Sequence, residues 1–344
     1  MEIEHQFRRP EPKQRAPRNR TLTLLDGERE ALASELLVLT ESTQLADVVG
    51  KVICQDAYCA LRYLPSESMD LIIVDPPYNK SKKFNSLDFH RCGNNEYIDW
   101  IDTWVREIAR VAKRTSTIYI CSDWESSLPV QIVVERYFSV RNRITWEREK
   151  GRGALSNWKN CSEDIWFCTK SDEFHFDVDA VKLNRRVMAP YRLQCGDPKD
   201  WVESGSGNFR LTHPSNLWTD LTVPFWSMPE NTDHPTQKPE KLIAKLILAS
   251  SKEGDLVLDP FLGSGTTSVV AKKLNRCFVG IESEEEFCLL ALKRLAMADQ
   301  DRSIQGFEGG VFWERNSLTD QKRNTTRASN RMEGSTLISL MEDQ

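Results

Sequence analysis

Two short apolar runs that each end in a polar turn constrain the fold of this chain most strongly. Residues 71–74 (LIIV) and 256–258 (LVL) are short, rich in branched side chains and followed by turn-forming residues, which is typical of buried strands. A polar residue just past the carboxyl end of a parallel strand lies where open α/β sheets bind their ligands. The sequence therefore predicts an α/β fold with two polar turns along one edge of a parallel sheet.

The first turn, residues 75–79 (DPPYN), combines hydrogen-bond acceptors with a flat aromatic ring. Pro76 and Pro77 fix two φ angles and lack backbone donors, so the nearby carbonyls stay free to accept hydrogen bonds. Asp75 adds a carboxylate, which only accepts when it is ionised, and Tyr78 adds an aromatic face. The group fits an amino group on a planar ring. Taken alone, it fits a strand-ending turn equally well, with Asp75 as a cap and Tyr78 as a packing residue.

The second turn has the composition of a cofactor loop. Gly263 and Gly265 allow a backbone to approach a ligand closely with φ above zero, and a helix is expected to begin at Thr266. The next predicted strand, residues 277–281, ends at Glu282. An acidic residue about 20 positions after a glycine turn, at the end of the following strand, is placed to bind ribose hydroxyls. The pattern is neither G-x-G-x-x-G nor a P-loop, which argues against phosphate binding.

Three motifs in this order resemble the amino-methyltransferases of DNA, which use S-adenosylmethionine. They are residues 75–79 (DPPYN), 234–239 (HPTQKP) and 261–267 (FLGSGTT), and the resemblance spans residues 52–295. Because the catalytic motif precedes the cofactor loop, the chain resembles the permuted β group of these enzymes. The resemblance implies a Rossmann-like methyltransferase sheet with permuted motif order and an inserted target-recognition region.

The resemblance also implies roles for the motif residues. A base flipped out of the duplex would stack on Tyr78 and donate its amino hydrogens to Asp75 and the Pro76 carbonyl, with Pro77 completing the catalytic turn. An acid such as Asp56, at the end of the first strand, faces the cofactor adenine in this family, while a helix N-cap is the alternative for it. The implied cofactor-binding residues are Asp56, Asp75, His234, Thr236, Lys238, Asp259, Phe261, Gly263, Ser264, Gly265, Thr266, Thr267 and Glu282. Catalysis would be mostly positioning, without a metal or a covalent enzyme intermediate.

The first residue of the catalytic motif bears on the target base. Family members with aspartate there mostly modify adenine N6 and those with serine mostly cytosine N4, so Asp75 favours adenine, with cytosine N4 as the alternative. A non-catalytic DNA-binding relative is a second alternative, and methylation of RNA or protein is a third. Protein glutamine methyltransferases usually carry asparagine at this place. The chain has no Pro-Cys dipeptide, which disfavours methylation of carbon.

A net charge of −5 does not exclude DNA binding, because only a local basic face is required. Basic residues gather in the amino-terminal arm (8–20), in the tail (322–331) and in residues 141–159, where tryptophans and glycines accompany them. A solvated face is the alternative for any such cluster. The predicted DNA-binding residues are Asn79, Arg148, Lys150, Arg152 and Lys159.

The chain divides into five predicted segments. Residues 1–45 form a polar arm with a helix near 28–39, and residues 46–170 form the catalytic half. Residues 171–231 lack clear periodicity and are assigned to target recognition, while residues 232–298 form the cofactor-binding half. Residues 299–344 form a polar tail with few apolar anchors, which is typical of disorder. Within the catalytic half we expect a helix over 97–112 and strands over 117–121 and 164–168.

Composition predicts a cytoplasmic enzyme, and the resemblance implies one from a prokaryote or a phage. The nine cysteines include no C-x-x-C pair, which favours reduced thiols and argues against a zinc site. The chain has neither a signal-peptide core nor an apolar run of the roughly 20 residues that span a membrane. The expected partner is double-stranded DNA, with no membrane and no metal. We expect a monomer or homodimer, and the sequence leaves open whether a cognate restriction endonuclease acts separately beside it.

Overall fold

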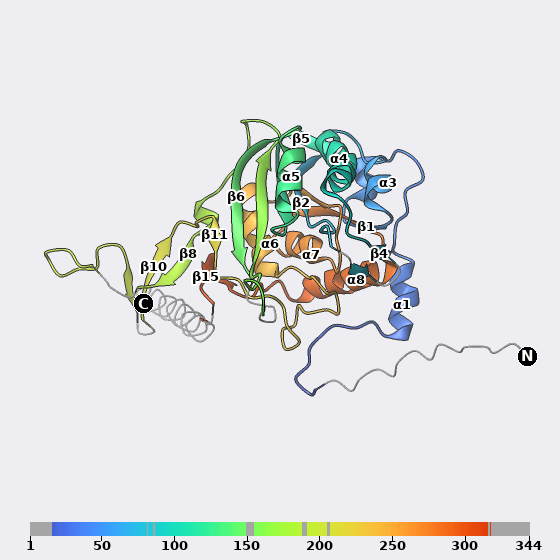
Figure 1. The fold of residues 1–344 in the computed structure, drawn as a ribbon. Coiled ribbons are helices and arrows are strands. Elements are labelled where there is room, and N and C mark those ends of the chain that lie inside the picture. The colour runs from blue at the N-terminus through green and yellow to red at the C-terminus, as the bar shows by residue number, and fades with distance from the viewer. Residues whose placement is uncertain are drawn as a thin grey trace, which may run out of the picture.

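The structure, a computed structural model, describes residues 16–80, 82–84, 87–148, 155–187, 191–204, 207–315 and 317. In these parts of the chain a large sheet carries helices on both faces, and a smaller sheet lies beside one end of it (Figure 1). This arrangement confirms the predicted α/β fold.

Among the described residues the large sheet has eight strands, in the order β1-β13-β12-β2-β5-β7-β6-β11. Neighbouring strands are parallel except that β7 runs antiparallel to both β5 and β6. The strands are β1 (Lys51–Cys54), β2 (Met69–Val74), β5 (Ala112–Ser122), β6 (Ser139–Glu147), β7 (Ser162–Thr169), β11 (Leu217–Trp218), β12 (Leu256–Asp259) and β13 (Cys277–Glu282).

The two apolar runs noted in the sequence are the neighbouring strands β2 and β12. They pair in parallel, with Val257 opposite Leu71, so the polar turns that follow them lie at the same edge of the sheet. Side chains of β2 alternate between two cores. Leu71 and Ile73 pack on one face, and Ile72 and Val74 pack on the other. Helices cover both faces, which explains why the run is apolar without alternation.

The helices divide into two layers (Figure 1). Helices α3, α4 and α5 pack with one face of the sheet, and α6, α7 and α8 pack with the other. The amphipathic helix predicted over 97–112 is α4, which begins three residues earlier. The bounds are α2 (Leu45–Val48), α3 (Ala57–Leu61), α4 (Asn94–Val111), α5 (Ser127–Val134), α6 (Glu240–Ser250), α7 (Thr266–Lys273) and α8 (Glu285–Gln300).

The first helix is shorter than predicted. Helix α1 spans Asp26–Ala33, whereas the sequence predicted a helix near 28–39. The chain then extends beside β1: the Leu37 amide donates to the Val52 carbonyl (3.1 Å), and the Cys54 amide donates to the Leu37 carbonyl (2.8 Å). Strand β1 is at the edge of the large sheet, and its exposed backbone groups need partners, which favours the extended conformation here.

The smaller sheet joins the predicted target-recognition region to the tail. Its order is β14-β15-β8-β10-β9, so the two tail strands, β14 and β15, extend the sheet that β8, β10 and β9 of the predicted target-recognition region form. Phe312 and Trp313 of β15 are 0% and 3% exposed, which shows that the prediction of disorder was wrong for this part of the tail. Residues 1–15 and 318–344 lie outside the described residues. The bounds are β8 (Leu183–Arg186), β9 (Val202–Ser204), β10 (Gly207–Thr212), β14 (Phe307–Glu308) and β15 (Val311–Trp313), with a 3-10 turn at η1 (Asp179–Val181) and a separate hairpin of β3 (Lys82–Phe84) and β4 (Leu87–Phe89).

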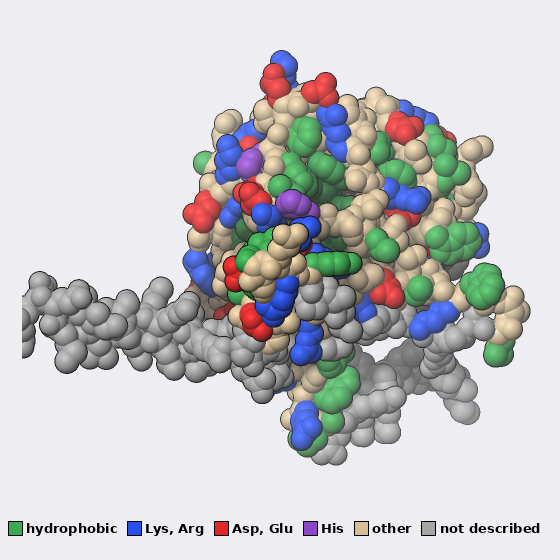
Figure 2. Space-filling view, turned by 90° about the vertical axis from the view of Figure 1, so that its left-hand side faces the viewer, with side chains coloured by type: hydrophobic (Ala, Val, Ile, Leu, Met, Phe, Trp, Pro, Cys, Tyr) green, Lys and Arg blue, Asp and Glu red, His purple; other side chains and the backbone are tan. Residues whose placement is uncertain are grey.

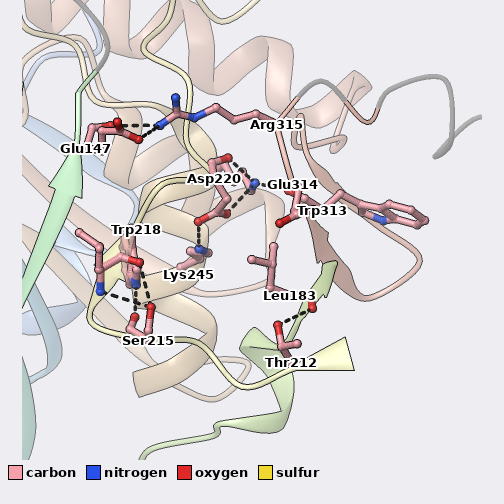
Figure 3. A network of polar contacts seen from close by, with 12 residues as sticks. Glu147, Leu183, Thr212, Ser215, Trp218, Asp220, Lys245, Trp313, Glu314 and Arg315 are labelled. Atoms are coloured by element: carbon pink, nitrogen blue, oxygen red, sulfur yellow. Dashed lines mark hydrogen bonds and ion pairs between the residues drawn. The ribbon is translucent and has the colours of Figure 1, made fainter. Parts of the chain in front are cut away.

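A buried ion cluster fastens the tail strands to the main domain (Figure 3). Lys241 and Lys245 of α6 each lie 2.7 Å from an Asp220 carboxylate oxygen, and Lys241 also donates to the Trp313 carbonyl. Burial, only partly offset by Asp220, lowers the pKa of Lys245 to about 8. Arg315 reaches Glu147 at the end of β6 (3.1 Å). The small sheet is thereby held against the strand that leads into the predicted DNA-binding loop. No described helix is long and apolar enough to cross a membrane.

Candidate active site

One cavity of about 530 Å³ contains both polar turns. It lies at the carboxyl ends of β1, β2, β12 and β13, where parallel sheets place their ligand sites. The predicted residues that line it are Asp56, Asp75, Pro76, Pro77, Tyr78, Arg148, His234, Thr236, Lys238, Asp259, Phe261, Gly263, Ser264, Thr266, Thr267 and Glu282. The structure thus brings together side chains that lie more than 200 positions apart in the sequence.

The glycine turn is fixed by hydrogen bonds among its own residues and to Glu282 at the end of β13. The Gly263 amide donates to Glu282 Oε2 (2.8 Å), and Gly263 has a φ of 54°, in the left-handed region. Asp259 accepts from the Phe261 amide (3.0 Å) and from the Thr267 hydroxyl (2.5 Å). The turn is therefore fixed by the residues that form it and by the end of the adjacent strand β13.

Gly265 supports this turn from behind rather than from inside the cavity. It has a φ of 88° and stands at the N-cap of α7. A Cβ atom there would lie 2.6 Å from the Cβ of Ala291 in α8, so only glycine lets the two helices approach this closely. Gly265 would therefore influence cofactor binding indirectly, through the packing of α7 against α8.

Two carboxyl groups at the glycine turn have raised pKa values. Burial, assisted by the charges of Asp75 and Glu282, raises the pKa of Asp259 to about 7, although bonds from Thr267 and the Phe261 amide oppose the shift. Burial also raises the pKa of Glu282, against the hydrogen bonds it accepts from backbone amides. Both groups face a site in which an added donor or cation would be favourable.

The acidic turn is held by side chains from distant segments. Lys238 Nζ lies 2.6 Å from Asp75 Oδ2, and Tyr97 of α4 donates to the Pro77 carbonyl (2.9 Å). The Tyr78 hydroxyl lies 2.9 Å from Asp75 Oδ1. Burial, followed by the charges of Asp75 and Glu163, raises the pKa of Tyr78 well above its usual range, so the hydroxyl keeps its proton.

Glu163 is a site residue that the sequence reasoning missed. It is 5% exposed, and its carboxylate lies 3.2 Å from the Tyr78 hydroxyl, 3.3 Å from Lys238 Nζ and 2.5 Å from Arg148. It stands opposite Trp146 in the antiparallel pair of β7 and β6. Its only local signal is an acid directly before the strand predicted over 164–168, and nothing nearby in the sequence points to Lys238.

Lys238 carries the complementary charge at the centre of the site. Burial would lower its pKa, but Asp75 and Glu163 outweigh that and raise it, so the side chain is a buried ammonium ion. Gln237, next to it, accepts from the Thr232 amide (2.9 Å) and donates to the Glu230 carbonyl (2.6 Å). These bonds fix the backbone that presents Lys238 and His234 to the cavity.

Asp56 occupies the N-cap of α3, which was the alternative to cofactor contact, and it also lies in the wall of the cavity. Its Oδ1 accepts from the Cys59 amide (3.0 Å). His234 packs edge-on against Phe287 (4.4 Å between ring centres), next to Gly263.

The residues predicted to bind DNA lie in different surroundings. Asn79 is 8% exposed, and both ends of its amide are bonded to the Cys92 backbone (2.9 and 3.0 Å), so it braces the loop instead of facing a ligand. Arg148 lies in the cavity wall, and Lys159 is exposed. Lys150 and Arg152 lie outside the described residues. On the end of the molecule that faces the viewer in Figure 2, basic side chains are interspersed with acidic ones.

The cavity fits a nucleoside-bearing cofactor. Asp56 and Glu282 offer carboxylates to hydroxyl or amino groups, and Phe261 offers an apolar face beside them. The Ser264 hydroxyl is 2% exposed and has no hydrogen-bond partner among the described residues. A buried polar atom of this kind needs a partner, and a ligand in the cavity would supply one. No cluster of His, Cys, Asp or Glu that could hold a metal ion occurs within the described ranges.

Fold and cavity together define the class of the protein. A Rossmann-like sheet with a glycine turn for a nucleoside cofactor, and an acceptor-rich turn on the neighbouring strand, characterises the methyltransferases built on this sheet. A model of the DNA methylase family matches residues 69–293. The chain belongs to this family of N6-adenine and N4-cytosine amino-methyltransferases, whose methyl donor is S-adenosylmethionine.

Individual relatives agree with this assignment. The chain is 35% identical over 263 residues to the type II methyltransferase M.HpaI of Haemophilus parainfluenzae, covering 75% of this chain and 76% of that protein. It is 33% identical over 265 residues to the DNA adenine methyltransferase YhdJ of Escherichia coli strain K12, covering 75% and 86%. Among solved structures, the cytosine-N4-specific PvuII DNA methyltransferase matches with a TM-score of 0.52 and 18% identity, over 74% of this chain and 87% of that one, which shows a shared fold.

Proposed function

We propose that this protein is a site-specific methyltransferase that acts on the N6 amino group of an adenine flipped out of double-stranded DNA. The observation that carries the proposal is that the acidic turn and the glycine turn, on adjacent parallel strands, line the same cavity. A ligand held by one turn is then within reach of a ligand held by the other. The family supplies the chemical class, and Asp75 together with the E. coli adenine methyltransferase favours adenine.

The target base would be held by the acidic turn. Tyr78 offers its ring for stacking, and Asp75 and the Pro76 carbonyl accept the amino hydrogens of the base. Asp75 already contacts Lys238 and Tyr78, but a carboxylate has about four lone-pair sites, so it keeps the capacity to accept more. These acceptors fix the direction of the nitrogen lone pair, and this orientation is the main contribution of the chain to the reaction.

The cofactor would be held by the glycine turn and the segment before α6. When bound, S-adenosylmethionine supplies an electrophilic methyl group. Glu282 and Asp56 are assigned to its hydroxyl and adenine groups, and Phe261 to the flat face of the adenine. The remaining residues assigned to the cofactor are His234, Thr236, Asp259, Gly263, Ser264, Thr266 and Thr267, which line the cavity, with Gly265 acting through the fold. Asp75 and Lys238, which line the same cavity, are assigned to the side of the target base.

DNA contacts are assigned to the loop after β6 and to the wall of the cavity. Arg148, Lys150, Arg152 and Lys159 would neutralise phosphates on either side of the flipped base. The smaller sheet, which the Asp220 and Arg315 contacts hold against the main domain, is assigned to target recognition. The relatives named type II methyltransferases favour a cytoplasmic role in restriction and modification, beside a separate endonuclease.

Cytosine N4 is the second candidate target. The PvuII enzyme, named as cytosine-N4-specific, shares the fold, and an acceptor-rich turn suits the amino group of either base. Sequencing of modified bases in DNA from cells that express the protein separates the two. We expect N6-methyladenine within one short sequence motif. N4-methylcytosine at a defined motif would establish the second candidate instead, and DNA without any modified motif would contradict both.

A further inference from the structure

Glu163 connects the acidic turn to the predicted DNA-binding side of the cavity. One carboxylate oxygen, Oε1, accepts from Arg148 (2.5 Å), which follows β6. The other, Oε2, lies 3.2 Å from the Tyr78 hydroxyl and 3.3 Å from Lys238 Nζ. Three segments of the chain thus converge on one buried side chain, and both of its oxygens are engaged.

Lys238 is shared between two carboxylates. Its ammonium lies 2.6 Å from Asp75 and 3.3 Å from Glu163, and its side chain is 8% exposed. In a buried site, the carboxylate that such a charge neutralises more fully becomes the weaker hydrogen-bond acceptor. Glu163 draws part of this interaction away from Asp75. Asp75 therefore keeps more of its negative charge for a donor in the cavity.

We propose that Glu163 is a positioning residue for methyl transfer, which orients the Tyr78 ring and shares Lys238 so that Asp75 stays available to the amino group of the base. This inference rests on the proposed function. It assigns a role to a side chain that lies beside the Tyr78 hydroxyl, as Asp75 does, but belongs to none of the three sequence motifs.

The charge balance of the site gives this role a distinctive signature. Asp75 and Glu163 face Lys238 and Arg148, two carboxylates against two cations. Removing the charge of Glu163 leaves Lys238 to neutralise Asp75, which weakens the acceptor and lowers kcat. The same change leaves the site with a net positive charge and frees Arg148, which attracts DNA phosphate. Turnover and DNA affinity are then expected to move in opposite directions.

The test is Glu163→Gln, which keeps the shape of the side chain and removes its charge. We expect kcat on duplex DNA to fall about 10- to 100-fold, as when one preorganised polar contact is lost from an active site. The Kd for DNA is expected to stay the same or tighten, and the Kd for S-adenosylmethionine to stay the same. Glu173→Gln is the matched control, since Glu173 follows the same strand β7 and pairs with Arg114 on the surface, outside the cavity. This control is expected to leave kcat unchanged.

Each other outcome overturns the inference. A kcat of Glu163→Gln equal to that of Glu173→Gln would show that Glu163 does not act on the reaction. Loss of DNA affinity together with kcat would indicate a purely structural role. If Glu163→Gln fails to fold, Arg148→Gln is the second test, because it leaves the contacts of Glu163 with Tyr78 and Lys238 in place. This variant should bind DNA more weakly with little change in kcat. A large loss of kcat in Arg148→Gln would refute the inference. A wild-type enzyme that methylates no DNA would instead contradict the proposed function itself.

Discussion

The two turns of the cavity sit on neighbouring strands, yet they are held in different ways. The glycine turn is fixed by bonds among residues 259–267 and by Glu282 at the end of the adjacent strand. The acidic turn depends on charged or hydroxyl groups of Tyr97, Glu163 and Lys238, which come from α4, β7 and the segment before α6. One turn is a local structure, and the other is assembled by the whole fold.

This difference predicts which property of the enzyme, cofactor binding or catalysis, a substitution in each turn should alter. A substitution in the glycine turn should disturb the cofactor alone, because its partners also belong to the cofactor half. A substitution in the acidic turn, or in any of its distant partners, should alter catalysis and leave the cofactor in place. The predictions below test this separation.

The largest effect is expected from Asp75→Asn. An amide in place of the carboxylate presents one acceptor instead of two and leaves Lys238 with only Glu163, so kcat should fall about 10³-fold. The Kd for S-adenosylmethionine, measured by calorimetric titration, should change little. Asp102→Asn on the surface of α4 serves as the control. Near-normal turnover of Asp75→Asn would show that the catalytic assignment is wrong.

A pH effect is expected from Asp259 in the glycine turn. Its pKa is raised from the usual 3.8 to about 7, mainly by burial, so its contribution to stability is complete below pH 4 and is lost as pH rises through 7. Asp259→Asn removes this titration. At about 1.4 kcal/mol for each unit of pKa, the free energy of unfolding of the wild type should decline by roughly 4 kcal/mol relative to the variant as the group titrates. Parallel stability curves from urea unfolding would contradict the raised pKa.

A smaller effect is expected from Gly263→Val. A branched side chain at a φ of 54° is strained by about 1–2 kcal/mol, and its Cβ would lie 3.0 Å from His234 Nε2. We expect S-adenosylmethionine to bind at least about tenfold more weakly. Gly254→Val is the matched control, because Gly254 also has a left-handed φ (85°) but has nothing within 4 Å of its Cβ position. Equal cofactor affinity in both variants would mean that the turn does not contact the cofactor.

The smallest effect is expected from Arg148→Gln. Loss of one phosphate contact should reduce the slope of log affinity for DNA against log salt by about 1. Arg141→Gln provides the comparison, since Arg141 lies on β6, the strand that Arg148 follows, pairs with Asp172 and does not line the cavity. Cofactor affinity should be unaltered in both. An unaltered slope for Arg148→Gln would assign the phosphate contacts to another part of the chain.

The same contrast explains what the sequence could predict. The strands, the glycine turn and the acidic turn are visible because each is encoded by contiguous residues with a period or a turn signal. Glu163 was not predicted, since its partners are joined to it only by the folded sheet. Asn79 belongs to a contiguous motif, but the motif does not show that both ends of its amide are bonded to the Cys92 backbone, 13 residues further along the chain.

Strand β15 in the tail was not predicted for the same reason, because its partners are distant in the sequence. Residues 311–313 (VFW) are too short an apolar run to predict a strand, and their partner β8 lies more than 120 residues earlier. Pairing with β8 and the contacts of Lys241 and Arg315 stabilise this segment. The polar composition of the tail predicted disorder, because composition does not show which distant residues a segment contacts in the folded protein.

The most direct test is to identify the methylated nucleoside. Purified protein would be incubated with duplex DNA and S-adenosylmethionine carrying a labelled methyl group, and the digested nucleosides separated by mass spectrometry. The account predicts label in N6-methyladenine with the wild type and almost none with Asp75→Asn, although that variant still binds the cofactor. Label on carbon 5 of cytosine, or no labelled nucleoside from an enzyme that binds S-adenosylmethionine, would contradict it.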